Sequence, residues 1–133
     1  MKKINVKRIY EEPSDDDGYR VLVDRLWPRG ISKNTAKLDD WNKEIAPSSG
    51  LRKWFDHKEE RFEEFTHQYK EELKLKEEAL NALRELSEHK TVSLLYAAKD
   101  PHLNQAIVLR SVLLKKEKER NSSPILSKFA LNE

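Results

Sequence analysis

The 133 residues of this chain are enough for one domain with its own hydrophobic core. The absence of cysteine excludes disulfides, thiolate metal sites and cysteine nucleophiles, and it is typical of a reducing compartment. The 26 lysines and arginines nearly balance the 24 acidic residues, which disfavours a protein that coats nucleic acid but not a local basic patch. Because the sequence has no signal-peptide pattern and no apolar run that could span a membrane, we expect a cytoplasmic protein.

Two strands are expected early in the chain. Residues 3–10 alternate and are rich in Ile, Val and Tyr, which predicts a strand near a sheet edge. A proline, an aspartate run and a glycine mark residues 11–18 as a solvated loop, and its short length favours a hairpin-like return. Three consecutive apolar residues from Val21 predict that 19–26 is a strand buried on both faces, which ends before Pro28.

The middle of the chain has a helical pattern. Residues 33–46 fit either a helix or a short strand. Ser48 or Ser49 is expected to cap a helix that follows directly. Apolar residues at helical spacing then predict helices over 59–74 and 77–89.

The last third of the chain is expected to hold a second buried strand at 91–98 and a helix at about 102–120. Residues 1–120 are interpreted as one domain, and 121–133 as a tail that is mobile or loosely docked. The order strand, helices, strand, helix predicts an α/β fold. Its small central sheet would have three or four strands, at least partly parallel, flanked by helices.

The functional surface is expected at the ends of the two buried strands. The strands at 19–26 and 91–98 should be parallel and joined by a right-handed crossover. Ligands in open α/β sheets bind beyond the carboxyl ends of the strands. These ends read DRLWPRG at 24–30 and YAAKD at 96–100, and both are rich in groups that bind or react.

Residues 18–30, GYRVLVDRLWPRG, resemble the hallmark of the YeaO-like proteins, which belong to a family catalogued as domain of unknown function 488. The resemblance spans roughly residues 4–114 in several ordered blocks, so it is specific. It implies a fold and a site but no reaction. The further blocks are Trp41, APS at 46–48, LRKWFDH at 51–57, LLYAAKD at 94–100 and Asn104.

One block departs from the family pattern. Where relatives usually read His-Asn-His-Ala after the Lys-Asp pair, this chain has Leu103, Asn104, Gln105 and Ala106. If the family's histidines serve as ligands or proton carriers, this chain lacks them at those positions, and His102 stands beside the motif rather than in it.

Basic and aromatic residues near the first buried strand are candidate ligand-binding groups. Arg25 and Arg29 follow the strand, and Lys33 and Arg52 are expected nearby. Guanidinium groups bind phosphate or carboxylate in a bidentate manner, and Trp27 is suited to stack on a base or sugar ring. The alternatives are a structural role for Arg25 and a core or pocket-wall role for Trp27.

Acidic and histidine side chains are the catalytic candidates. Asp24 and Asp100 each end a buried strand, where a carboxylate can act as a general base or anchor a ribose hydroxyl. His57 closes the LRKWFDH block and is the candidate proton carrier. Lys99 and Asn104 flank Asp100 as ligand-binding candidates. The alternatives are loop capping for Asp100 and helix capping for Asn104.

No cofactor or metal is predicted. The four histidines show no metal-ligand spacing and no HExxH motif, and the three glycines form no phosphate-binding loop.

Three functions fit these residues. The first is an enzyme or sensor for a small anionic molecule that is nucleotide-like or phosphorylated. The second is a nucleic-acid-binding module of a stress or defence system, against which the charge balance counts. The third is a non-catalytic interaction domain that docks a partner through the helix at 102–120 or the tail at 121–133. No membrane association is expected, and the sequence predicts no oligomeric state.

Overall fold

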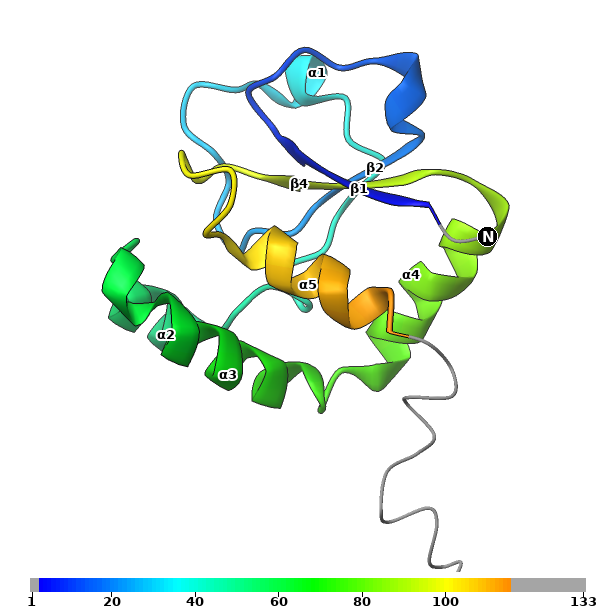
Figure 1. Ribbon diagram of the computed structural model, residues 1–133. Helices are drawn as coiled ribbons and strands as arrows, with labels where there is room; N and C mark the ends of the chain where they lie inside the picture. The colour runs from blue at the N-terminus through cyan, green and yellow to red at the C-terminus, as the bar shows by residue number, and fades with distance from the viewer. Residues whose placement is uncertain (1–2, 116–133) are drawn as a thin grey trace, which may run out of the picture.

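A computed structural model describes residues 3–115 of the chain as an α/β fold around a parallel sheet (Figure 1). The sheet has four strands in the order β1-β4-β2-β3, and every neighbouring pair is parallel. The predicted fold class is confirmed, as is the parallel pairing of the two buried strands. The strands are β1 (Ile4–Arg8), β2 (Tyr19–Leu22), β3 (Asp40–Trp41) and β4 (Val92–Tyr96).

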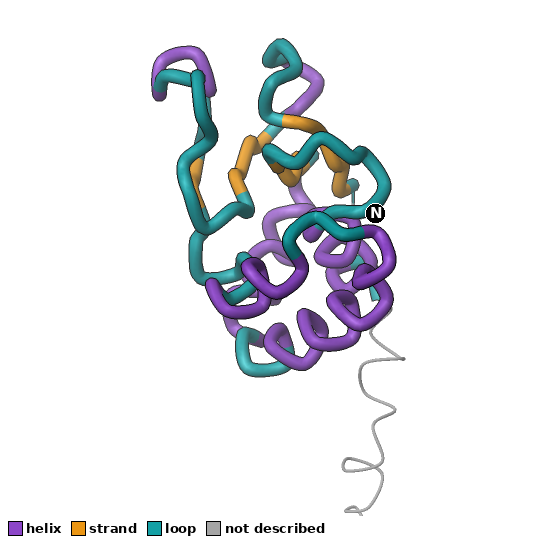
Figure 2. Tube along the Cα trace, turned by 90° about the vertical axis from the view of Figure 1, so that its left-hand side faces the viewer, coloured by secondary structure: helices purple, strands orange, loops and turns teal. Residues whose placement is uncertain are grey.

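The helices lie on both faces of this sheet but unequally. Helices α2 to α5 gather on one face, and α1 lies on the other among long connections (Figures 1 and 2). Ser48 caps α2 by accepting a hydrogen bond from the backbone of Leu51, as one of the two sequence alternatives expected. The helices are α1 (Lys33–Ala36), α2 (Ser49–Phe55), α3 (Phe62–Leu73), α4 (Glu77–His89) and α5 (Gln105–Leu113), with 3₁₀ turns at Asp15–Asp17 and Glu59–Arg61.

Strand alternation divides the core into two clusters. Val21, Leu94 and Tyr96 point to the face covered by α2 to α5 and join the larger cluster. Leu22 and Leu95 point to the opposite face and join a smaller cluster with Ile9 and Ala36. Both faces of β2 and β4 are therefore covered, which explains the continuous apolar sequence of these strands.

The hairpin-like return expected at 11–18 is wrong. β1 and β2 both run parallel to β4, which lies between them, so the connection crosses the sheet instead of folding back. The entry into β2 requires Gly18, whose φ is 65° and whose added Cβ would lie 2.3 Å from the carbonyl oxygen of Thr91. At Gly18 the chain thus passes too close to Thr91, between the end of α4 and the start of β4, for any larger residue.

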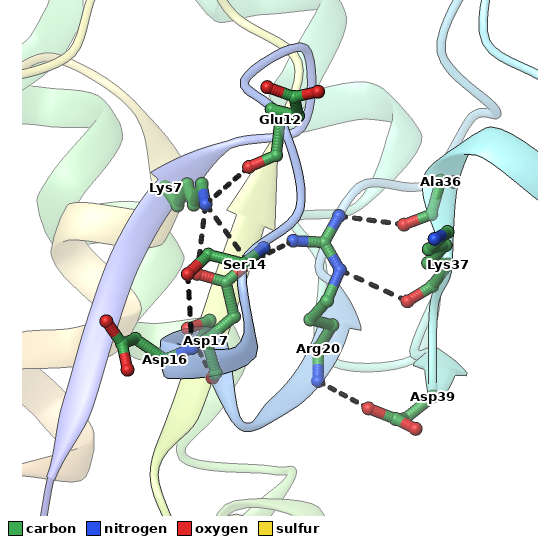
Figure 3. Close-up of polar contacts among 10 residues, drawn as sticks. Lys7, Glu12, Ser14, Asp16, Asp17, Arg20, Ala36, Lys37 and Asp39 are labelled. Carbon is green, nitrogen blue, oxygen red and sulfur yellow. Dashed lines mark hydrogen bonds and ion pairs between the residues drawn. The ribbon is translucent and has the colours of Figure 1, made fainter.

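A buried ionic network fixes this crossing (Figure 3). Asp17 accepts hydrogen bonds from Lys7 Nζ at 2.9 Å and from an Arg20 guanidinium nitrogen at 2.6 Å. Arg20 also donates to the carbonyl oxygens of Ala36 and Lys37, at 2.7 and 3.1 Å. The network joins β1, β2 and α1, and its charged side chains pair with one another and with backbone carbonyl oxygens.

Several element boundaries differ from the sequence predictions. The strand expected at 19–26 ends at Leu22, and residues 33–46 hold both the helix α1 and the strand β3. The helix expected at 102–120 begins only at Gln105 and ends at Leu113, while the tail at 121–133 lies outside the described residues. Within residues 3–115, no helix is long and apolar enough to cross a membrane.

Candidate functional site

A cavity of about 210 Å³ lies beyond the carboxyl ends of β2 and β4. The chain leaves β2 toward the face of α1 and leaves β4 toward the face of α5, so the two connections diverge at this point. Such a divergence opens a crevice in parallel sheets and is where ligands bind. The polar side chains in the lining are Asp24, Arg25, Arg52, His57, Asn104 and Gln105, and the apolar ones include Trp27, Phe55, Phe65 and Leu103.

Asp24 lies two residues after β2, with its carboxylate in this lining. Its Oδ2 accepts a hydrogen bond of 2.9 Å from the backbone N–H of Ala97, just after β4. Its own carbonyl oxygen accepts the indole N–H of Trp41 at 2.7 Å. Burial raises the pKa of Asp24 to about 6, although the hydrogen bonds from Ala97 and Gln105 act in the opposite direction. The carboxyl therefore changes charge near physiological pH.

Gln105, the first residue of α5, holds the other carboxylate oxygen. Its Nε2 donates a short hydrogen bond to Asp24 Oδ1 and a second to the carbonyl oxygen of Val23 at 3.4 Å. This is a position where the family resemblance implies a histidine. An amide does not titrate, so Gln105 orients Asp24 but exchanges no proton with it.

Arg52, on α2, brings a guanidinium to the same lining. Its Nε is buried without a hydrogen-bond partner, and its side chain forms no ion pair with any residue in 3–115. Its charge acts on Asp24 across the pocket without direct pairing. A buried donor without a partner is uncommon and costs free energy unless a ligand or water satisfies it.

Arg25 and Trp27 line the pocket but use their donors within the fold. The Arg25 side chain donates to the carbonyl oxygens of Pro47 and Ala46, at 2.9 and 3.2 Å. The indole N–H of Trp27 donates to the carbonyl oxygen of Ile31 at 2.7 Å. Arg25 thus fixes the approach to α2, and Trp27 supplies a rigid wall.

His57 follows α2 at the rim of the pocket. It is exposed, and its φ of 55° places it in the left-handed region just after Asp56, the C-cap of α2. Its ring lies 6.2 Å from that of Phe55, which itself stacks on Phe65 at 4.4 Å. The histidine therefore has solvent access and contributes to the field around Asp24.

Asn104 and Asp100 both have capping roles. Asn104 is 1% exposed and accepts a hydrogen bond from Ile107 N while donating to the Asp100 carbonyl oxygen. The Asp100 carboxylate accepts the backbone N–H groups of His102 and Leu103, and these bonds lower its pKa. Asn104 belongs to the pocket lining, whereas Asp100 lies outside it.

Three basic candidates also lie outside the lining. Arg29, Lys33 and Lys99 are exposed, and the hydrogen bond at Arg29 uses its backbone carbonyl, which accepts from Tyr10. The structure thus brings together six of the ten sequence candidates. These are Asp24, Arg25, Trp27, Arg52, His57 and Asn104.

The sequence reasoning missed the contacts of Gln105 and the aromatic floor made by Phe55 and Phe65. The departure from the family pattern singled out Gln105, but only as a missing histidine. Apolar residues at helical spacing are typical of core packing, and periodicity alone does not show that a core residue also borders a cavity.

Comparison with known proteins places this chain among uncharacterised relatives. Residues 3–128 match a family described as the inactive DUF488-N3 subclade. The uncharacterised protein YeaO of Escherichia coli K12 is 44% identical over 106 residues, covering 80% of this chain and 92% of its own. The uncharacterised protein Rv3073c of Mycobacterium tuberculosis H37Rv is 42% identical over 111 residues, covering 84% and 93%. No solved structure matches the chain with significance.

Proposed function

The chain belongs to the YeaO-like proteins of the DUF488 family, in the inactive DUF488-N3 subclade, and from this premise we propose that its pocket binds a small anionic ligand without transforming it. The observation that carries the proposal is Arg52, whose guanidinium lines the cavity with a buried Nε that has no partner within residues 3–115. A carboxylate or phosphate would complete its hydrogen bonds in a bidentate manner.

The size of the cavity limits the ligand. Its volume of about 210 Å³ is below the roughly 300–1,000 Å³ of pockets that enclose drug-sized molecules. A small carboxylic acid or a phosphorylated fragment fits inside, whereas a whole nucleotide would extend into solvent. This favours a metabolite-sized ligand over a nucleic acid.

The proposal that the pocket catalyses no reaction is supported by the hydrogen-bond partners of the Asp24 carboxylate. A general base must pass its proton on, and the hydrogen bonds to the Asp24 carboxylate within residues 3–115 come from the Ala97 backbone and the Gln105 amide, which do not titrate. Gln105 has no proton to relay. The word inactive in the subclade description supports the same conclusion.

Thermal unfolding across a panel of small carboxylates and phosphates tests the proposal. A ligand that binds the native state raises the midpoint by mass action, with a rise that saturates as its concentration increases. Arg52→Ala should abolish the rise. Lys53→Ala, which removes an exposed charge from the neighbouring position of α2, should preserve it. Equal shifts in wild type and Arg52→Ala would exclude this pocket as the anion site.

A further inference from the structure

The polar groups of the pocket divide into a donor side and an acceptor side. Arg52 presents a positive charge and a buried Nε–H donor without a partner, on the side of α2. Asp24 presents a carboxylate on the side of β2, held there by Ala97 and Gln105. The two opposite charges share one lining, yet no ion pair within 4.0 Å joins them in the described chain. A ligand with a single anionic group satisfies only half of this arrangement.

Gln105 strengthens the acceptor side. Both hydrogen bonds of its side chain leave from Nε2, toward Asp24 and toward Val23, so its Oε1 is kept as an acceptor. The orientation of the amide follows from the carboxylate, which accepts and does not donate when ionised. A negative oxygen pair beside an amide oxygen matches a group that is positively charged and carries several donors.

An ammonium group has this chemistry. It carries three N–H donors and one positive charge, whereas a hydroxyl carries one donor and no charge. Resting on the proposed anion-binding function, we propose that the pocket takes a zwitterion, a small apolar α-amino acid whose carboxylate meets Arg52 and whose ammonium meets Asp24 and Gln105. The walls made by Phe55, Phe65 and Leu103 then face its side chain.

The charges around the pocket agree with a zwitterion. The titratable side chains in the lining are Asp24, Arg25, Arg52 and His57, which come from the β2 end, α2 and the turn after it. Arg25 keeps its charge but directs its guanidinium to the carbonyl oxygens of Pro47 and Ala46, so Asp24 and Arg52 are the negative and positive groups left to meet a ligand. A ligand of zero net charge and large dipole fits this pair.

Matched ligands separate the two proposals. Binding of leucine, 4-methylpentanoate, 2-hydroxy-4-methylpentanoate and 3-methylbutan-1-amine would be measured by calorimetry at pH 7.5 with the full chain, and alanine and valine would test size. We expect leucine to bind at least about tenfold tighter than the two acids that lack the amine, as charge-assisted hydrogen bonds allow. Arg52→Ala should abolish binding of all the acids.

Gln105→Leu should lower the ratio of the dissociation constant of 4-methylpentanoate to that of leucine, because it removes an acceptor from the ammonium. Gln68→Leu, on the outer face of α3 where Gln68 pairs with Glu64, should leave the ratio unchanged. If the three acids bind equally in the wild type, the zwitterion is excluded and the anion pocket stands. If neither leucine, alanine, valine nor the acids bind, the zwitterion is excluded, and the anion site fails as well if the phosphates of the unfolding panel do not bind.

Discussion

The side-chain amide of Gln105 donates a hydrogen bond to the carboxylate of Asp24, joining the first residue of α5 to the end of β2 across the pocket. The second carboxylate oxygen accepts the backbone N–H of Ala97, after β4. Asp24 therefore ties together three segments that border the cavity. Its position explains both its burial and its sensitivity to pH.

Asp24→Asn should change how stability depends on pH. Burial raises the pKa of Asp24 to about 6 from its ordinary value of 3.8, so the folded protein binds a proton more readily than the unfolded chain. The associated stability is fully present below pH 3.8 and is lost as pH rises through about 6. Relative to that of Asp24→Asn, the free energy of unfolding of the wild type should fall by at most about 3 kcal/mol between pH 4 and pH 7.

Urea unfolding of both proteins at several pH values measures this difference. Asparagine can accept from Ala97 with its oxygen and donate to Gln105 once that amide reverses, so the variant should fold. A difference that is constant or that grows in favour of the wild type with rising pH would contradict the raised pKa.

The sequence located this site through the carboxyl ends of parallel strands, which is a property of topology. The sequence could not show that Arg25 donates its hydrogen bonds within the fold, because the acceptors are carbonyl oxygens of Ala46 and Pro47, far away in the chain. The sequence also could not show that Arg52 lines the pocket and Arg29 does not. Only the path of the turn after β2 decides that the Arg29 side chain stays outside the pocket lining.

The wrong prediction of a hairpin at residues 11–18 also arose because the sequence does not show tertiary contacts. A short loop between two strands normally indicates a hairpin. Here the ion pairs of Asp17 with Lys7 and Arg20 stabilise a crossing instead, and such pairs leave no periodic pattern in the sequence. The apolar run of β2 and β4, by contrast, correctly predicted burial on both faces.

Asp17→Asn should show a pH dependence opposite to that of Asp24→Asn. Burial opposes ionisation of Asp17, but hydrogen bonds from Lys7, the Ser14 backbone and Arg20 outweigh it and lower its pKa below 3.8. The stability from this carboxylate is present above pH 3.8 and is lost as pH falls through the lowered folded pKa. At pH 7 the variant should lose about 3–5 kcal/mol, since it leaves Arg20 buried without its counter-charge.

Unfolding in urea at pH 7 and at pH 3 tests this. The difference in free energy of unfolding between the wild type and Asp17→Asn should be smaller at pH 3 than at pH 7. A variant as stable as the wild type at pH 7 would show that the network in Figure 3 contributes little.

Arg25→Ala and Arg52→Ala should separate structural from ligand-binding arginines. Arg25 donates to two carbonyl oxygens, so its loss should cost about 1–3 kcal/mol. Arg52 has no hydrogen-bond partner for its buried Nε, so Arg52→Ala should not lower the free energy of unfolding measured without ligand. Equal losses of several kcal/mol in both variants, measured without ligand, would give Arg52 a structural role.

Gly18→Ala should be more destabilising than Gly30→Ala. Both glycines have positive φ, 65° and 75°, but a Cβ at Gly18 would lie 2.3 Å from Thr91 O, while Gly30 has no heavy atom within 4 Å of that position. Gly30→Ala should cost only backbone strain, about 1–2 kcal/mol, and Gly18→Ala should cost more than that. Midpoints of thermal unfolding compare the two, and an equal loss would contradict the close approach to Thr91.

The most direct test of the anion site is the ¹H–¹⁵N resonance of the Arg52 Nε–H, assigned by its loss in Arg52→Lys. Titration with acetate, phosphate and leucine should shift this resonance in a saturable way and slow its exchange with water, because a bound anion would partner the buried donor. An Arg52 resonance that none of these molecules moves, while another site on the chain responds, would contradict the proposed pocket.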